Sequence, residues 1–149
     1  MLNALMYKSR VFALSLVVGF LGLSVGCATG PHWDAEQRNV LEGRVRDRWH
    51  ALEVRDFEKA WEYTSPNYRA IFSKQLYVQN FSYAVEWELT GVEIVNYDND
   101  AAVASVVVRV MSKPTKQTSS ASVALGATPS TLRERWIFAD GQWWFSSNY

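Results

Sequence analysis

The ionisable side chains that could carry chemistry are few, and they are scattered over the sequence. Those that the expected helices and strands could bring to one cavity are Tyr63, Tyr68, Glu86, Glu88, Arg109, Arg135 and His50. A carboxylate or a histidine can serve as a general base, and a tyrosine hydroxyl can polarise a carbonyl group. No spacing joins these residues into a catalytic motif. We therefore predict no catalytic residue, and the sequence indicates a class of function rather than a reaction.

Arg109 is the least ordinary of these residues, because it stands within a run of valines, Val106 to Val110, in an expected strand. An unpaired buried charge is costly. Either that side of the strand opens to a cavity or to the surface, or a carboxylate pairs with the arginine. The candidate partners are Glu88, Asp100 and Glu134. In a cavity, Arg109 would suit an anionic ligand and would bind a carboxylate in a bidentate manner.

Simpler structural interpretations stand beside these chemical ones. Glu86 and Glu88 alternate with apolar residues, which is typical of the solvated face of a strand. Tyr63 and Tyr68 have rings suited to packing around Pro66, and each hydroxyl needs only one partner.

The sequence contains no motif for metal, nucleophile or phosphate chemistry. His32 and His50 are the only histidines and Cys27 is the only cysteine, so we predict no metal site and no cofactor. A Gly-x-Ser-x-Gly motif and a Gly-rich phosphate loop are both absent. Basic and acidic residues number 15 each, and loss of the first 26 residues would remove Lys8 and Arg10 but no acid. Nucleic acid is therefore not an expected partner.

The N-terminal segment has the pattern of a targeting signal. Lys8 and Arg10 precede an apolar stretch, residues 11–25, which is short for a membrane span. Gly26 and Cys27 follow this stretch, and they resemble the bacterial lipoprotein signal, although Ser24 stands where that pattern prefers Leu. Two alternatives remain open: ordinary signal cleavage after Ala28, or retention of the segment as an uncleaved anchor.

The lipoprotein resemblance implies a definite organisation and location. Residues 1–26 would be the signal peptide, Cys27 would carry the lipid, and residues 27–33 would form a tether. Several acyl chains together anchor a protein stably to a bilayer. The protein would then be membrane-anchored in the bacterial cell envelope and face the periplasm. Ala28 after the cysteine, rather than Asp, favours the outer membrane over the inner one.

Helical patterns fill the first half of the remaining chain. Asp34 and Gln37 form a capping box for a helix over residues 35–53, whose apolar face is Leu41, Val45, Trp49 and Leu52. Gly43 lies inside this helix, and a close approach by another element would explain it. Asp56 can cap a second helix, which Ser65-Pro66 ends. We expect a turn at residues 67–69 and a third, short helix capped by Ser73.

After Ser82 the apolar period changes to that of strands. A parity switch at Thr90-Gly91 predicts a β-bulge that bends the first strand. Residues 98–100 form a turn, and residues 101–111 form a strand that is apolar on both faces and therefore central. Residues 113–130 are rich in Ser, Thr and Ala and are expected to be a mobile connection. Residues 131–149 form a hairpin around Asp140-Gly141, a pair that favours a type I′ turn.

Helices followed by strands favour an α+β fold. Asp56-Phe57, Trp61-Glu62-Tyr63, the run from Ser65 to Arg69, and Phe72-Ser73 together resemble the helical half of NTF2-like (SnoaL-like) domains. The resemblance covers residues 34–149. It implies a cone in which about three N-terminal helices pack on a curved four-stranded antiparallel sheet and leave an open-ended cavity. Ketosteroid isomerases, polyketide cyclases and dehydratases share this fold.

The resemblance, with the absence of a catalytic motif, favours a non-catalytic module that binds a small ligand or a partner. The residues expected to line its pocket are Trp61, Tyr63, Tyr68, Trp87, Arg109, Trp136 and Trp144. The cavity would hold a small apolar or anionic ligand, unless its own side chains fill it. The first alternative is a small enzyme of the isomerase or cyclase type. The second is a structural subunit that forms a homodimer through an exposed face of the sheet.

Overall fold

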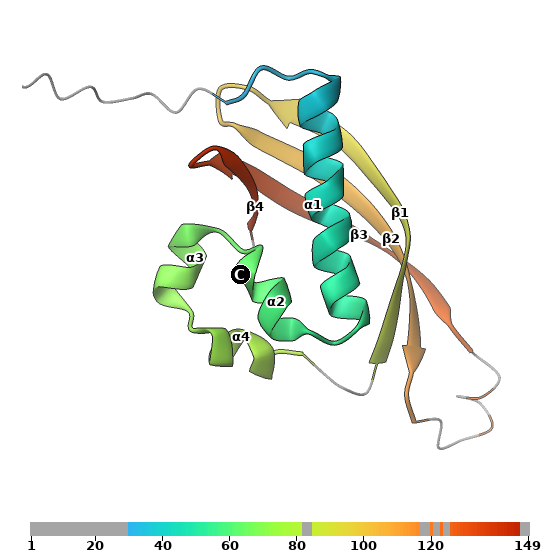
Figure 1. Ribbon diagram of the computed structural model, residues 1–149. Helices are drawn as coiled ribbons and strands as arrows, with labels where there is room; N and C mark the ends of the chain where they lie inside the picture. Colours follow the sequence, from blue (N-terminus) through green and yellow to red (C-terminus); the bar gives the residue numbers. More distant parts are fainter. Residues whose placement is uncertain (1–29, 82–84, 117–119, 121–122, 124–125, 147–149) are drawn as a thin grey trace, which may run out of the picture.

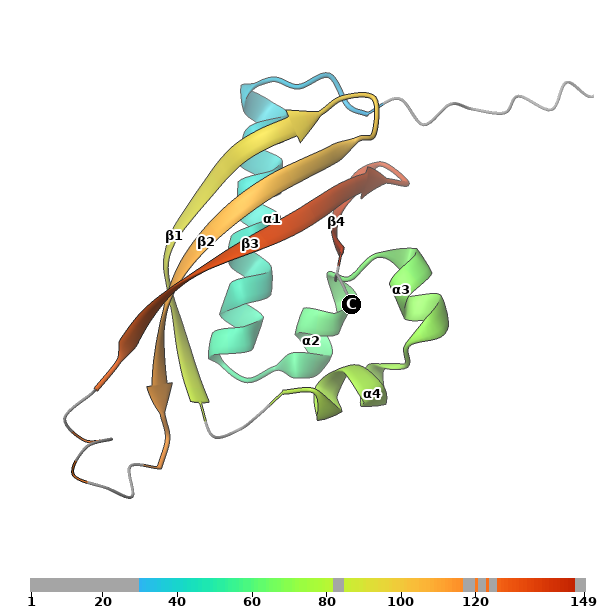
Figure 2. The ribbon, with the colours of Figure 1, turned by 180° about the vertical axis from the view of Figure 1, so that it is seen from behind.

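The structure, a computed structural model, describes residues 30–81, 85–116, 120, 123 and 126–146. Helices come first and strands follow (Figure 1): α1 (Ala35–Glu53), α2 (Phe57–Glu62), α3 (Pro66–Ile71), α4 (Lys74–Gln79), β1 (Val85–Asp98), β2 (Val103–Pro114), β3 (Thr128–Ala139) and β4 (Gln142–Ser146). The strands form one antiparallel sheet in the order β1-β2-β3-β4. Figures 1 and 2 show α1 on one face of this curved sheet. The predicted α+β fold, with helices packed on a curved four-stranded antiparallel sheet, is confirmed.

Between residues 30 and 81 the chain forms one helix more than expected. The segment predicted as a turn at residues 67–69 lies within α3. Ser65 caps this helix, because its side chain accepts a hydrogen bond from the Tyr68 N–H at 3.2 Å. Pro66 occupies the first helical turn, where its fixed φ and missing N–H are favourable. Helix α2 has already ended at Glu62, so the proline begins a helix rather than ending one.

The local sequence explains how α1 packs. Asp34 accepts a hydrogen bond from the Gln37 N–H at 2.8 Å and caps the helix as predicted. The predicted apolar face, residues 41, 45, 49 and 52, is buried. Arg48 is buried on the same face. The close approach expected at Gly43 is wrong, because no described atom lies within 4 Å of a Cβ placed there.

The sheet bends where its sequence predicts. The β1–β2 register shifts between Leu89 and Gly91, which confirms the bulge. At this bulge the Leu89 N–H donates to the Glu53 carboxylate at the end of α1. Strand β2 is central, and its Ala104, Val106, Val108 and Val110 are 0–1% exposed.

The hairpin between β3 and β4 has the predicted turn. Asp140 and Gly141 have φ values of 53° and 76°, the left-handed conformations that a type I′ turn requires. The edge of β4 is covered by the α2–α3 linker: the Phe145 N–H donates to the Tyr63 carbonyl at 2.8 Å, and the Ser65 N–H donates to the Phe145 carbonyl at 3.0 Å. This pairing holds the short helices beside the sheet.

Two sequence predictions concern segments at the limits of the described residues. Strands β2 and β3 reach Pro114 and Thr128, so the expected connection over residues 113–130 is shorter than predicted; part of it lies outside the described residues. The signal peptide and Cys27 also lie outside them. No described helix has the length and apolar character needed to cross a membrane.

Candidate functional site

A pocket of about 330 Å³ lies between α1 and the part of β3 that extends beyond β4. We call it the cone pocket. Strand β4 pairs only with the segment from Arg135 to Ala139, so the edge of β3 before Arg135 has no strand partner among the described residues. The helical end of the pocket comes from Arg48, Trp49 and Leu52 of α1. The other lining residues are Phe81, Trp87, Leu132, Arg133, Glu134, Arg135, Phe145 and Ser146.

A buried carboxylate, that of Glu134, forms one wall of this pocket. Arg48 Nη1 donates to its Oε1 at 2.8 Å, and Trp49 Nε1 donates to the same oxygen at 3.0 Å. Trp136 Nε1 donates to its Oε2 at 2.9 Å. The Arg48 and Glu134 side chains are only 6% and 5% exposed. A buried ion pair with additional hydrogen bonds meets the conditions under which burial of charge is tolerated.

Beside this pair, two buried polar atoms have no hydrogen-bond partner among the described residues. They are Arg48 Nε and the Tyr77 hydroxyl. Burial raises the pKa of the Tyr77 phenol, and the nearby Arg48 opposes this rise. The Arg48 guanidinium packs on the Phe145 ring, with the guanidinium carbon 3.7 Å from the ring centroid. Unsatisfied buried polar atoms are rare. Tyr77 does not line the pocket, so a water molecule buried behind the pocket wall is the partner that both atoms could share.

The remaining walls are aromatic. The Trp49 and Trp87 rings meet edge to face, with centroids 6.2 Å apart. Phe81 also lines the pocket and stacks on Phe57 at 4.7 Å. A site with apolar walls and a few fixed polar groups is typical of small-molecule pockets.

The predicted pocket residues do not all lie in one place. Trp87 lines the cone pocket, and Trp136 is fully buried beneath it with its indole on Glu134. Tyr68 is buried among the short helices, where it stacks on Phe72 at 4.9 Å. The other predicted aromatic residues, Trp61, Tyr63 and Trp144, form a separate group around Arg44 and Arg69.

The prediction that Arg109 lines the pocket is wrong. Inward-facing residues of β2 flank it, so alternation turns its side chain to the outer face, where it is 54% exposed. Its Nη2 donates to Glu93 Oε2 at 2.5 Å, so the partner is none of the three predicted carboxylates. Gly91 lies opposite Arg109 in the sheet and has no side chain, which leaves a path across the bulge for the arginine.

Other candidate residues are on the surface. Glu86 and Glu88 are exposed, as the solvated-face interpretation predicted. His50 is exposed at the edge of α1. Arg135 is exposed, although part of it contributes to the rim of the pocket.

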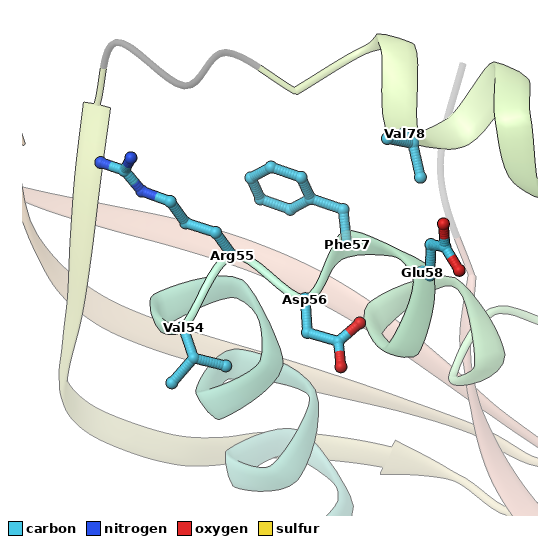
Figure 3. Close-up of a pocket in the computed structure, with 6 residues that line it drawn as sticks. All are labelled: Val54, Arg55, Asp56, Phe57, Glu58 and Val78. Atoms are coloured by element: carbon cyan, nitrogen blue, oxygen red, sulfur yellow. The ribbon is translucent and has the colours of Figure 1, made fainter.

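A second depression of about 320 Å³ lies where α1 ends and α2 begins. Figure 3 shows that its side chains diverge rather than point to a common centre. Arg55 extends toward β1 and pairs with Glu86 at 3.5 Å, and Asp56 caps α2 through the Lys59 N–H at 2.9 Å. These groups have structural partners, so the depression is the weaker candidate. Among the described residues, no group of three or more His, Cys, Asp or Glu could hold a metal ion.

Comparison with known proteins supports the fold. No protein-family model matches the sequence, and no curated protein matches it. A protein with a cystatin-like fold from Caulobacter vibrioides is similar in structure, with a TM-score of 0.51 and 12% identity over 74% of this chain and 84% of its own. A SEC-C motif containing protein from Rhodopseudomonas palustris has a TM-score of 0.42 and 19% identity over 71% and 74% of the two chains. A protein provisionally named a scytalone dehydratase, from Novosphingobium aromaticivorans, has a TM-score of 0.43 and 17% identity over 74% and 79%. The support comes from the Caulobacter protein and concerns the fold alone, because the other two TM-scores are below 0.5.

Proposed function

We propose that the protein is a lipid-anchored protein of the bacterial envelope whose NTF2-like domain binds a small ligand in the cone pocket without catalysing a reaction. The observation that carries the proposal is the fixed polar group at Glu134, set in a pocket whose other walls are aromatic. Aromatic walls would bury an apolar, flat ligand, and the arginine side chains that line the pocket, Arg48, Arg133 and Arg135, would orient one of its oxygen atoms.

The geometry supports binding more than catalysis. Glu134 accepts three hydrogen bonds, and it would have to break some of them before it could take a proton from a substrate. The other ionisable residues that line the pocket are Arg48, Arg133 and Arg135. Arginine stays protonated and cannot act as a base. An isomerase or cyclase would need a free base, and no described lining residue supplies one.

The pocket is tested with the aromatic probe 1-anilinonaphthalene-8-sulfonate, whose fluorescence rises in apolar sites. The full chain should bind the probe saturably, and Trp87→Ala should weaken binding about tenfold, since the wall loses a large ring. Trp33→Ala is the matched control, because it removes a half-buried tryptophan that does not line the pocket. Equal effects of the two variants, or no saturable binding to the wild type, would reject the proposal.

Acylation at Cys27 is proposed from the sequence and needs its own test. Metabolic labelling with an alkyne fatty acid should mark the wild type and leave Cys27→Ala unlabelled and free of the membrane. Labelling of the variant, or a wild type without label, would contradict acylation at this residue. Fractionation should find the wild type mainly in the outer membrane.

A homodimer through the sheet face is the weaker alternative. The outer face carries the exposed charged residues Glu93, Arg109, Arg133 and Arg135. Stable homodimer interfaces are usually more apolar. Light scattering on the purified chain should therefore give the mass of a monomer.

A further inference from the structure

A second group of side chains lies outside the cone pocket, where α1, the α2–α3 segment and β4 meet. The Arg44 guanidinium carbon lies 5.0 Å from the centroid of the Tyr63 ring and 5.3 Å from that of Trp144. The Arg69 guanidinium carbon lies 4.5 Å from the same Trp144 ring and 5.6 Å from that of Trp61. Two cations therefore share one tryptophan, and none of these five residues lines the cone pocket.

Neither guanidinium pairs with a carboxylate among the described residues. Arg44 Nε donates to the Trp143 carbonyl at 2.6 Å, and Arg69 Nη1 donates to the Glu62 carbonyl at 2.8 Å. Both partners are neutral backbone oxygens. Each guanidinium has five N–H donors, so most of them remain available.

The carboxylate of Glu62, whose backbone carbonyl accepts from Arg69, is already engaged by lysines. Glu62 lies 2.8 Å from Lys59 Nζ and 3.6 Å from Lys74 Nζ. Lys74 Nζ in turn lies 5.3 Å from the centroid of the Trp61 ring. Two arginines and two lysines therefore outnumber the two carboxylates that act on them, Glu62 and Asp47, and the group holds an excess of positive charge.

The surroundings of Arg44 disfavour its positive charge. Burial lowers the pKa of Arg44, and the neighbouring Arg69 charge acts in the same direction, against the opposite effects of Tyr63 and Asp47. A like charge nearby and partial removal from water both disfavour a cation. An anion placed between the two arginines would relieve both effects.

We propose that Arg44 and Arg69 form a binding site for a small soluble anion with two negative charges, of the phosphate or phosphate-monoester class. Two guanidinium groups without carboxylate partners match a dianion, whereas a single carboxylate would leave one of them uncompensated. A phosphate monoester carries about 1.5 to 2 negative charges at neutral pH. The planar fork of arginine matches phosphate oxygens, and the adjoining aromatic rings keep part of the solvent away.

The same phosphate chemistry is found in lipid headgroups, but the position of the site favours a soluble source. Figures 1 and 2 show α2 and α3 near the C-terminal end of α1, away from residues 30–34, through which the chain would reach an anchor at Cys27. Arg69 belongs to α3 and therefore lies away from the anchored end, so we favour a soluble anion that can reach both arginines. This inference goes beyond the proposed function, because it concerns a different site and ligand.

The test uses the isotope-labelled full chain in zwitterionic detergent micelles, observed by NMR. Inorganic phosphate should shift the Arg44 and Arg69 Nε–H signals and the Trp144 indole signal saturably, and chloride at equal ionic strength should not. The double variant Arg44→Met, Arg69→Met should weaken binding about tenfold or more, because charge-assisted hydrogen bonds are lost. A second arm adds phosphatidylglycerol to the micelles, and it should leave these signals in place.

Arg38→Met is the matched control. Arg38 is on the same helix and lies 5.2 Å from the centroid of the Trp33 ring, but Arg44 and Arg69 do not share that ring. This variant should bind phosphate like the wild type. Should the double variant fail to fold, Arg69→Gln alone keeps the Arg44 contacts and should still weaken binding. The proposal is overturned if the wild type shows no saturable shift, if the variants bind equally, or if only phosphatidylglycerol moves the signals.

Discussion

Glu134 accepts hydrogen bonds from Arg48, Trp49 and Trp136 at a place where both charged side chains are almost fully buried. The attraction within such a pair is largely offset by the loss of hydration. The pair therefore matters mainly because either partner alone would be a buried, uncompensated charge. Removal of one member tests this more directly than replacement of the whole group.

Glu134→Gln should destabilise the domain by about 3–5 kcal/mol, because the Arg48 charge then stays buried without its counter-charge. Glu93→Gln is the matched control, since the Arg109–Glu93 pair has side chains 54% and 53% exposed. That change should cost about 0–1 kcal/mol. Urea unfolding followed by tryptophan fluorescence measures both changes in the free energy of unfolding. Similar losses for the two variants would show that the buried pair contributes no more to stability than the exposed pair.

Tyr77 provides a prediction that depends on pH. Because burial raises its pKa, the folded state holds the phenol proton more tightly than the unfolded chain, whose tyrosine pKa is about 10. This stabilisation is complete below pH of about 10 and is lost as the pH rises through the higher folded value. Tyr77→Phe should therefore lose less stability above pH 10 than the wild type.

At neutral pH, Tyr77→Phe should leave the free energy of unfolding unchanged or raise it, because the hydroxyl has no hydrogen-bond partner among the described residues. Chemical unfolding of both proteins at neutral and alkaline pH measures the difference. A loss above about 1 kcal/mol at neutral pH would instead show that the hydroxyl makes a hydrogen bond, to Arg48 or to an ordered water.

The buried pair could have been found in the sequence, but only in part. Arg48 follows Leu41 by seven residues and Val45 by three, so it lies on the apolar stripe of α1. Glu134 shares the inward parity of Trp136 on β3. Two opposite charges, one on the buried face of a helix and one on the buried face of a strand, indicate an ion pair between them. The sequence could not show that these two faces meet, because their contact depends on the curvature of the sheet.

At the scale of single elements, local signals predicted the structure well. The cap at Asp34, the bulge at Thr90-Gly91 and the turn at Asp140-Gly141 depend on residues that are neighbours in the chain. The contact between Glu53 and the Leu89 N–H was not predicted, since it joins the end of α1 to the bulge. Helix α3 is not predicted although its signal is local, because a Ser-Pro pair can either end a helix or cap and begin one.

Gly141→Val should destabilise the domain by about 1–3 kcal/mol, because a β-branched residue resists the φ of 76° at this position. The hairpin carries Trp136 and Trp143, both fully buried, so strain in the turn affects the core. Thermal unfolding by circular dichroism measures the effect, and an unchanged melting temperature would reject the turn as a constraint.

Gly43→Ala should raise the stability of the domain, whereas Gly141→Val should lower it. Its position in α1 is helical, and a Cβ there would meet no described atom within 4 Å. Alanine should raise stability by about 0.5–1 kcal/mol, because it restricts the unfolded chain and favours the helix. A loss of stability in the same thermal assay would indicate that another molecule packs against this face of α1.

For the whole molecule, the segment before α1 connects the domain to any anchor. Residues 30–33 were expected to belong to a tether, but they contact the end of the sheet. Trp33 stacks on Tyr97 at 4.5 Å and meets Trp143 edge to face at 5.9 Å. The Tyr97 hydroxyl donates to the Pro31 carbonyl at 3.2 Å. An acylated Cys27 would therefore leave only a few residues of free chain, and the end of the cone that carries Trp33 would face the bilayer.

Trp33→Ala tests whether this docking fixes the domain relative to its anchor. Loss of the contacts with Tyr97 and Trp143 should cost about 2 kcal/mol in the free energy of unfolding. Amide exchange of residues 32–35 should become faster, while binding of the aromatic probe stays unchanged, because none of these residues lines the cone pocket. His32→Ala is the control, since His32 is exposed beside Trp33 and should change neither quantity. If Trp33→Ala also left stability and exchange unchanged, the segment would be a free tether and the end of the cone near the bilayer would not be fixed.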